Sequence, residues 1–364
     1  MTTTILITGI GGLTPRSVAK TIKRSHPEYR LIGCDIDENA IGFYMDGLVD
    51  EHRVCPKCTS PDYFPWIKEL VVEEGVDYAF VQPESEIVEW ARYREETGEY
   101  PCPVFMGDLR LSAALKDKAV MAELLKGTHF IPRTIKITQS MPCYKEVEEQ
   151  IGFPCWIRAT EGTGGLGSLR LENLSSFKSW LFINRDIEEF TVSEFLPGRH
   201  LANEMLYYNG EYVKGAALEC AEYVMADVAP SRVTGNTRLG RFLNDDRVNA
   251  FCDECIKFLE KKLSTQAHGI LSFDLKEDAC GNLKVTEVNI RHMAYVGVMA
   301  QAGFDLIEDT IAILESGTAD CVHREPYFHF AKPFVFLRDV DVEPILLDSE
   351  AYPALCGVAE GKVR

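Results

Sequence analysis

The stretch ILSFDLKEDACGNLKVTEVNIR, residues 270–291, decides the fold we expect for this chain, because it reads as a β-hairpin. Apolar and polar residues alternate on both sides of a turn-forming segment, Asp278 to Asn282, as they do in two paired strands. A turn centred on Cys280 and Gly281 places Asp274 opposite Glu287. Since successive side chains of a strand point to opposite faces, the hairpin has one apolar and one polar face.

The polar face of this hairpin has the composition of a metal site. It is formed by Ser272, Asp274, Glu287, Asn289 and Arg291. Its two carboxylates and one carboxamide are oxygen ligands of the kind that suit Mg²⁺ shared with substrate phosphates, and the arginine can neutralise a further negative charge. The opposite face, which we expect in the core, is formed by Leu271, Phe273, Leu275, Val288 and Ile290. The alternative interpretation is a surface hairpin with an ordinary polar face.

Three segments upstream provide groups suited to phosphate. Lys118 precedes a helical run, and the strand-like run 153–158 ends in Arg158. The loop 162–168 contains four glycines, which allow backbone N–H groups to approach phosphate oxygens closely. It lacks the Lys-Ser/Thr ending of a P-loop. We therefore predict a flap between two strands, and the alternative is an ordinary mobile hairpin loop.

A further strand, residues 190–196, can run along an adenine ring and offer it backbone donors and acceptors. His200 and Glu204 follow just past the turn. A lone histidine at such a position is more often a surface or core residue than a ligand.

In this order, the segments resemble the ATP-grasp superfamily, on the branch of biotin carboxylase and the carbamoyl-phosphate synthase large subunit. The resemblance covers roughly residues 1–318, and its most specific part is 287–291, which matches the family's Glu-x-Asn-x-Arg. It implies a mixed α/β (α+β) ATP-grasp fold with a Rossmann-like N-terminal lobe. The implied divisions are a pre-ATP-grasp lobe at 1–112, an ATP-grasp domain at 113–320 with a glycine-rich lid subdomain at about 128–193, and a C-terminal extension at 321–364.

The resemblance also implies a role for each matching position. The implied ATP-binding residues are Lys118, Arg158, Gly162, Thr163, Gly164, Gly165, Glu194, Phe195, Leu196, His200 and Glu204. The implied ligands of Mg²⁺ (or Mn²⁺) are Asp274, Glu287 and Asn289, and the implied catalytic cations are Lys118, Arg158 and Arg291. Two departures stand out: Arg158 replaces a lysine of most members, and His200 takes the place of a ribose-binding Glu, as it does in biotin carboxylases.

The implied activity is an ATP- and Mg²⁺-dependent ligase, which activates a small carboxylate as an acyl phosphate for attack by an amine and releases ADP and phosphate. A carboxylase-like enzyme that activates bicarbonate and a non-catalytic ATP-binding protein are the alternatives. The expected partners are a small carboxylate and an amine, with a homodimer by analogy.

The N-terminal region resembles a dinucleotide-binding βαβ unit. Thr4–Thr8 and Arg30–Cys34 are predicted strands, and a helix is predicted from Thr14 as N-cap, with Pro15 at its first position, to about Arg24. Because Thr14 occupies the place of the third fingerprint glycine, an NAD-dependent oxidoreductase is a weak interpretation.

Four further residues are candidate substrate contacts. Glu84 and Glu86 follow a predicted strand, 76–82, in what reads as a loop, where they either hold an amine or are solvated. Arg232 and Arg238 lie in a polar segment, where they either grip a carboxylate or are ordinary surface arginines.

Composition agrees with a globular enzyme. The 364 residues are 46% hydrophobic, and a net charge of −18 argues against a nucleic-acid partner. No apolar run approaches about 18 residues, so we expect no membrane span and a cytoplasmic protein. The 12 cysteines include two CxxC pairs, Cys55/Cys58 and Cys252/Cys255, that are too far apart for a zinc ribbon. We expect Cys252 and Cys255 to lie on the packed face of a helix over 248–263.

Overall fold

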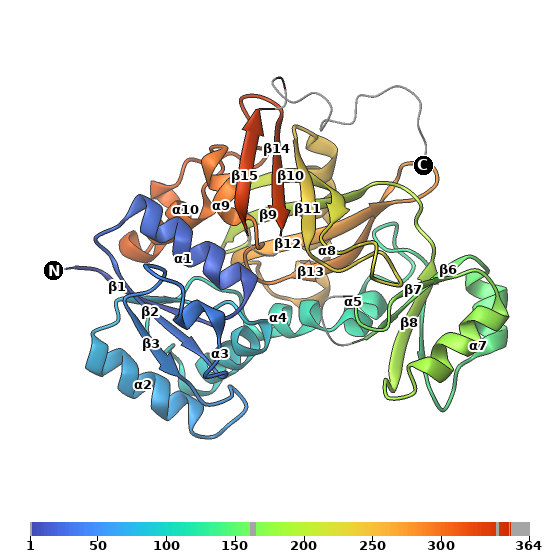
Figure 1. Cartoon of the computed structure of the whole chain (residues 1–364), viewed down its shortest axis with the longest axis horizontal. Helices are drawn as coiled ribbons and strands as arrows, with labels where there is room; N and C mark the ends of the chain where they lie inside the picture. The colour runs from blue at the N-terminus through green and yellow to red at the C-terminus, as the bar shows by residue number, and fades with distance from the viewer. Residues whose placement is uncertain (1, 161–164, 340–341, 349, 351–364) are drawn as a thin grey trace.

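The computed structural model describes residues 2–160, 165–339, 342–348 and 350, and within these residues the strands form three sheets (Figure 1). The first sheet and its helices form the N-terminal lobe, the second forms a small lid, and the third is the large sheet that joins them. The chain therefore has the mixed α/β class that the sequence predicts.

The N-terminal lobe is a parallel sheet in the order β3-β2-β1-β4, which confirms the predicted Rossmann-like arrangement. Its strands are β1 (Thr4–Thr8), β2 (Arg30–Asp35), β3 (Glu51–Val54) and β4 (Tyr78–Phe80). Its helices are α1 (Leu13–Ser25), η1 (Ile41–Phe43), α2 (Tyr63–Glu74) and α3 (Glu84–Thr97). Every residue of β1 is buried, so this central strand fixes where the following turn and the start of α1 lie.

Two predictions for this lobe are wrong in detail. Helix α1 begins at Leu13 with Gly12 as N-cap, so Pro15 occupies the third helical position. This position tolerates proline because the first N–H groups of a helix have no intrahelical partner. The segment of Glu84 and Glu86 is the first turn of α3 rather than a loop.

The lid is an antiparallel sheet in the order β5-β8-β6-β7, reached from the N-terminal lobe through α4 (Leu109–Lys116) and α5 (Lys118–Leu124). Its strands are β5 (Thr134–Thr138), β6 (Cys155–Ala159), β7 (Leu169–Leu171) and β8 (Glu189–Glu194). Its helices are α6 (Tyr144–Glu146), η2 (Val147–Ile151) and α7 (Leu174–Ile183). The glycine-rich loop connects β6 to β7, as expected for a flap between two strands.

The large sheet has the order β13-β12-β9-β10-β11-β14-β15. Its strands are β9 (His200–Tyr208), β10 (Glu211–Tyr223), β11 (Thr237–Leu243), β12 (Gly269–Glu277), β13 (Leu283–Asn289), β14 (Phe334–Asp339) and β15 (Val342–Asp348). Its helices are α8 (Asp246–Leu263), α9 (Val296–Gln301), α10 (Leu306–Ser316) and η3 (Ala319–Cys321). The segment expected as an extension thus adds two strands to this sheet, through the pairing of β14 with β11.

Helices cover both faces of the large sheet. Helix α8 packs on the face that carries Phe273, and α9 and α10 pack on the face that carries Ile270. Cys252 and Cys255 are fully buried on the packed face of α8, as predicted. In the described part of the chain, no cluster of three or more His, Cys, Asp or Glu side chains is arranged for a metal, and no helix is long and apolar enough to cross a membrane.

Candidate active site

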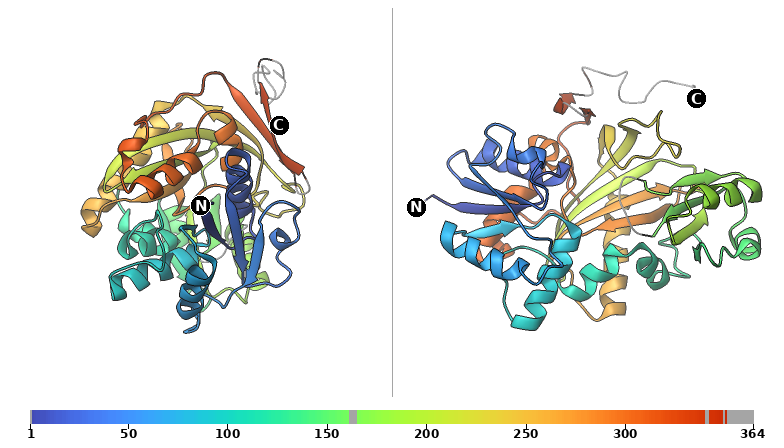
Figure 2. Two further views of the ribbon diagram at one scale, coloured as in Figure 1. Left: turned by 90° about the vertical axis from the view of Figure 1, so that its left-hand side faces the viewer. Right: turned by 60° about the horizontal axis from the view of Figure 1, so that its bottom comes forward.

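A cavity of about 770 Å³ is lined by residues of the N-terminal lobe, the lid and the large sheet, whose arrangement Figure 2 shows. The turn after β1 and the start of α1 line one end of it, and the lid strands β6 and β8 line the other. The hairpin of β12 and β13 also contributes to the lining. The sequence segments singled out as phosphate and metal sites therefore converge on one space.

The hairpin has the register that the sequence predicts. Asp274 pairs with Glu287, and Ser272 pairs with Asn289. A bulge follows Asp274, so that Leu275 pairs with Val285, and Thr286 is the extra residue. The Thr286 hydroxyl donates a hydrogen bond of 3.0 Å to the Asp274 carbonyl. The expected core face is buried throughout, with Phe273 and Leu275 completely inaccessible.

Two cations from other elements approach the hairpin carboxylates. Lys118, the first residue of α5, places Nζ 3.0 Å from Glu287 Oε1. It is oriented by Asp117, whose side chain caps α5 by accepting from two backbone N–H groups. Arg158 on β6 donates a 2.6 Å hydrogen bond to the Thr286 carbonyl. Burial lowers the pKa of Arg158, and the nearby carboxylates of Glu287 and Asp274 oppose that shift.

Asp274 is held as a carboxylate. Burial alone would raise its pKa, but His200, Arg291 and Asn289 outweigh burial and hold the pKa below its usual value. His200 Nε2 lies 3.5 Å from Asp274 Oδ1, and the other ring nitrogen of His200 is hydrogen-bonded to the Tyr223 hydroxyl. The Asp274 side chain keeps 31% of its surface accessible, so it remains available to a ligand in the cavity.

Arg291 joins the hairpin to the N-terminal lobe. Its guanidinium donates to Asn289 Oδ1 at 3.2 Å and to Thr14 Oγ1, on α1, at 3.4 Å. Its Nε lies 3.9 Å from Glu84 Oε1 at the start of α3. Burial raises the pKa of Glu84, and Arg291 partly offsets this shift. Glu84 therefore lies beside a predicted catalytic cation, although the cavity lining does not include it.

The segment 194–196 lines the cavity at the lid end. The Glu194 carboxylate pairs with Arg133 at 3.1 Å, and Arg170 of β7 stacks 4.4 Å from the Phe195 ring centre. Within the described residues, the Leu196 N–H donates no hydrogen bond, so this backbone donor is available to a ligand.

The glycine-rich loop is described in part. Gly165 lines the cavity with a φ of +77°, and a Cβ there would lie 2.5 Å from the Val233 carbonyl oxygen, so the position requires glycine. The predicted contacts of Gly162, Thr163 and Gly164 lie outside the described residues.

Two predicted site residues lie beneath the cavity instead of in it. Glu204 is completely buried and accepts a 3.1 Å hydrogen bond from the Met293 N–H, and its Oε1 lies 3.0 Å from His292 Nδ1. Glu204 therefore supports the segment that follows Arg291. The prediction that Glu204 contacts the nucleotide is corrected, because its side chain is buried away from the cavity lining. Glu86 points into the core, where burial raises its pKa to about 7. This carboxyl group does not line the cavity and is not placed to hold a substrate amine.

The two predicted substrate arginines also lie outside the cavity lining. Arg238 is exposed and pairs with Glu222 at 2.9 Å, with both side chains 52% accessible. Arg232 occupies a turn with a φ of +57°, between lining residues Ser231 and Val233. The misplacement of Arg238 follows from the alternation of side chains along β11, because Thr237 faces inward and Arg238 faces outward.

Some residues that line the cavity were not predicted as site residues, among them Lys276, Tyr295 and Arg338. Lys276 continues the alternation of Asp274 along the same face and was therefore detectable. Arg338 lies on β14, and burial lowers its pKa. No local pattern links Arg338 to the hairpin, because only the addition of β14 to the large sheet brings it to the cavity.

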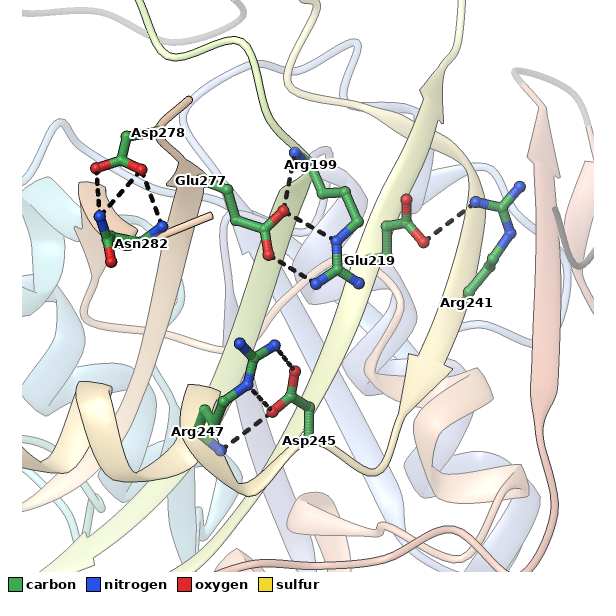
Figure 3. A network of polar contacts seen from close by, with 8 residues as sticks. All are labelled: Arg199, Glu219, Arg241, Asp245, Arg247, Glu277, Asp278 and Asn282. Carbon is green, nitrogen blue, oxygen red and sulfur yellow. Dashed lines mark hydrogen bonds and ion pairs between the residues drawn. The ribbon is translucent and has the colours of Figure 1, made fainter. Parts of the chain in front are cut away.

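Polar contacts fix the segment after residue 196 to strand β12 (Figure 3). Arg199 donates two hydrogen bonds to the Glu277 carboxylate, at 3.0 and 2.6 Å. Glu219 pairs with Arg241 across β10 and β11, and Asp245 with Arg247 at the start of α8. In Figure 3 the paired side chains of Arg199 and Glu277 lie across neighbouring strands, so β9 and β12 are joined at the end nearest the lid.

Comparisons with known proteins locate this architecture among solved enzymes. No protein-family model matches the sequence, and no curated protein is similar to it. One similar structure is N5-carboxyaminoimidazole synthetase from Staphylococcus aureus, with 15% identity, a TM-score of 0.66, and coverage of 93% of this chain and 83% of that chain.

Two further structures agree. The biotin carboxylase domain of Hydrogenobacter thermophilus 2-oxoglutarate carboxylase has 15% identity and a TM-score of 0.66, covering 93% of this chain and 74% of that chain. L-amino acid ligase from Bacillus licheniformis has 11% identity and a TM-score of 0.65, covering 92% and 79%. These are ATP-grasp enzymes, and at such identities the similarity establishes that this chain has the ATP-grasp fold.

Proposed function

From the ATP-grasp fold and the contents of its cavity, we propose that this chain is an ATP- and Mg²⁺-dependent ligase. It converts a small carboxylate to an acyl phosphate for attack by an amine and releases ADP and phosphate. One observation carries the proposal: the paired carboxylates of β12 and β13 share a cavity with cations from three separate elements. The similar structures, which include a synthetase, a carboxylase domain and a ligase, support it.

The nucleotide base is assigned to the lid end of the cavity. Residues Glu194 to Leu196 line that end, and the Leu196 N–H is available as a donor. His200 is the candidate for a ribose contact, since it lines the cavity at the start of β9. The loop 162–168 is assigned to the phosphates on the strength of its glycines.

The residues present fit a magnesium ion. Asp274, Glu287 and Asn289 are hard oxygen donors side by side on two paired strands. Mg²⁺ is usually bound by one or two carboxylates, with phosphate and water completing its coordination, so Asp274 and Glu287 suffice and Asn289 adds a further oxygen. Bound there, Mg²⁺ would neutralise phosphate charge and help to orient the phosphoryl group for transfer. That Mn²⁺ can take the place of Mg²⁺ is a further part of the proposal.

The remaining work falls to three cations. Lys118 and Arg158 stabilise negative charge on the phosphates, because Lys118 pairs with Glu287 and Arg158 binds the carbonyl of the adjacent Thr286. Arg291 binds the acid and stabilises its phosphorylated form, since it reaches from the hairpin toward Thr14. Positioning and electrostatics of this kind need no covalent nucleophile on the protein. The amine then displaces phosphate.

The proposal extends to organisation and partners. We assign residues 1–112 to the pre-ATP-grasp lobe, 113–320 to the ATP-grasp domain with its lid, and 321–364 to a C-terminal extension that contributes β14 and β15 to the large sheet. A homodimer and a cytoplasmic location are further parts of the proposal.

A bicarbonate-activating enzyme is the second candidate. The observation in its favour is His200, which lines the cavity and is held between Tyr223 and Asp274. One of the similar structures is a biotin carboxylase domain solved with MgADP and bicarbonate. Turnover with bicarbonate alone separates this candidate from the first.

The test is ADP and phosphate release from Mg²⁺–ATP in the presence of a panel of small carboxylic acids, amino acids and bicarbonate, with and without hydroxylamine. Hydroxylamine converts an acyl phosphate to a hydroxamate. Turnover with one acid, together with its hydroxamate, is the expected result and identifies half of the substrate pair. Binding of Mg²⁺–ATP without turnover on any acid would instead favour a non-catalytic ATP-binding protein.

A further inference from the structure

Lys276 connects the metal-bearing strand to the segment assigned to the nucleobase. It follows Asp274 by two residues on β12 and therefore points to the same face. Its Nζ donates hydrogen bonds to the Leu196 carbonyl at 3.2 Å and to the Gly198 carbonyl at 3.0 Å. Lys276 also lines the cavity. One side chain thus spans the two halves of the proposed nucleotide site.

The segment that Lys276 holds has lost its strand partners. Pro197 has no N–H, and strand β8 ends at Glu194. The following residues dock on β12 through backbone bonds, Gly198 N–H to the Glu277 carbonyl at 3.0 Å and Glu277 N–H to the Arg199 carbonyl at 3.1 Å. A Cβ at Gly198 would lie 2.5 Å from Glu277 Cβ, so the backbone there is packed closely against β12. Leu196 is therefore the carbonyl whose direction depends on Lys276.

A half-buried ammonium at this position carries a desolvation cost. Burial lowers the pKa of Lys276, and the neighbouring Glu277 opposes this shift. Glu277 itself is already engaged by Arg199 (Figure 3). Among the described residues, the hydrogen bonds of Lys276 go to carbonyl groups and none goes to a carboxylate. An aliphatic side chain would fill the same space without the desolvation cost.

The polarity of the segment follows from these bonds. The Leu196 carbonyl is bound to Lys276, whereas the N–H of this cavity-lining residue donates no hydrogen bond within the described residues and is available as a donor. The N1 atom of adenine accepts a hydrogen bond, whereas N1 of hypoxanthine and of guanine carries a hydrogen and donates one. A donor that faces a donor leaves both groups unpaired, which is penalised in a desolvated site.

We propose that Lys276 is the residue that sets the nucleobase preference, by binding the Leu196 carbonyl and leaving a hydrogen-bond donor facing the base. The inference rests on the proposed nucleotide site and extends it to a specificity-determining position. Without the ammonium, the Leu196 carbonyl is free to turn toward the cavity and accept from an N1–H purine.

The test compares the affinities of ADP and inosine diphosphate, measured by calorimetry with Mg²⁺, for the wild-type chain and for Lys276→Met. The wild-type chain is expected to prefer ADP by about tenfold or more, and the variant by less than about threefold. Lys276→Arg, which keeps the donors, is expected to retain most of the preference. Lys284→Met is the matched control, because Lys284 faces Lys276 in the strand register but binds the His129 carbonyl outside the cavity.

The outcomes separate this inference from the function on which it rests. No ADP binding by the wild-type chain would overturn the nucleotide site and this inference with it. Wild-type ADP binding, with the same ADP preference in Lys276→Met, would overturn the role of Lys276 alone. Lys276→Leu, which also removes the donors, is measured in parallel in case the methionine variant does not fold. An undiminished preference in the folded Lys276→Met or Lys276→Leu protein contradicts the inference, and a preference reduced at least threefold supports it.

Discussion

The two ends of the cavity are built in different ways. The phosphate end comprises Asp274, Glu287, Lys118 and Arg158, and its carboxylates lie on adjacent strands in direct register. The substrate end comprises Thr14, Arg291 and Arg338, which come from α1, the segment after β13, and β14, and Glu84 of α3 lies beside Arg291. A hairpin brings its residues together through local pairing, whereas the second group depends on how whole lobes pack.

Site residues can be predicted from the sequence more readily at the phosphate end than at the substrate end. At the phosphate end, strand alternation and one turn fix which side chains are neighbours. At the substrate end, residues separated by more than 270 positions meet, as Thr14 and Arg291 do. The four predictions below ask whether the two ends are also separable in function.

The largest effect is expected for Glu287→Gln, which removes a charge from the phosphate end. Turnover should fall by about a thousandfold or more, because charge on the phosphates is no longer balanced through this ligand. Stability should change by only about 1 kcal/mol, since the ion pair with Lys118 is partly exposed. ADP release and thermal unfolding measure the two quantities. Glu222→Gln, at an exposed glutamate paired with Arg238, is the control, and a folded Glu287→Gln protein that retains a tenth of the activity would contradict the assignment.

Arg291→Ala should affect the acid and spare the nucleotide. We expect kcat/KM for the acid to fall about a hundredfold, because the arginine between Asn289 and Thr14 stabilises the acid and its phosphorylated form. The Kd for ADP should stay within about threefold, as the lid end is unchanged. Steady-state kinetics and calorimetry provide both values. Equal losses in the two would show that the ends of the cavity act as one unit.

Glu84 and Glu86 lie in one turn of α3 but have different surroundings. Burial of Glu86 makes the stability of the folded protein depend on pH. Its pKa is raised by burial from 4.5 to about 7, so the folded protein holds this proton more tightly than the unfolded chain. The stabilisation is complete below about pH 4.5 and is lost as pH rises to about 7, a change of roughly 3 kcal/mol. Glu86→Gln should therefore gain stability relative to the wild-type chain between pH 5 and pH 8, with turnover unchanged. Denaturant unfolding at both pH values checks this, and parallel stability curves would refute it.

The smallest effect is expected for Arg238→Ala. Since Arg238 is exposed and bound to Glu222, activity should stay within about twofold and stability within about 0.5 kcal/mol. A tenfold loss of kcat/KM for the acid would instead indicate that Arg238 contacts the substrate. Unfolding midpoints distinguish such a loss from a change in stability.

The fold could be predicted from the sequence where the periodicity of apolar residues is strong. The register of Asp274 with Glu287, the strand Thr4–Thr8 and the packed cysteines of α8 follow from alternation and helical spacing. The beginning of α1 was misplaced, because Gly12 provides the cap without a side chain.

The site was foretold less evenly, and for physical reasons. Glu204 shares the polar face of Asp274 but lies deeper, under the segment that carries His292 and Met293. Alternation gives the face of a residue and not its depth. Arg338 reaches the cavity only because β14 pairs with β11, and a single sequence carries no signal for that long-range pairing.

The most direct test of the central claim is the affinity of ADP measured by calorimetry with and without Mg²⁺, for the wild-type chain and for Glu287→Gln. The account predicts binding that Mg²⁺ strengthens in the wild-type chain and a loss of that strengthening in the variant, because Glu287 holds the ion. ADP binding that is equal in both proteins and indifferent to Mg²⁺, or no binding at all, would contradict it.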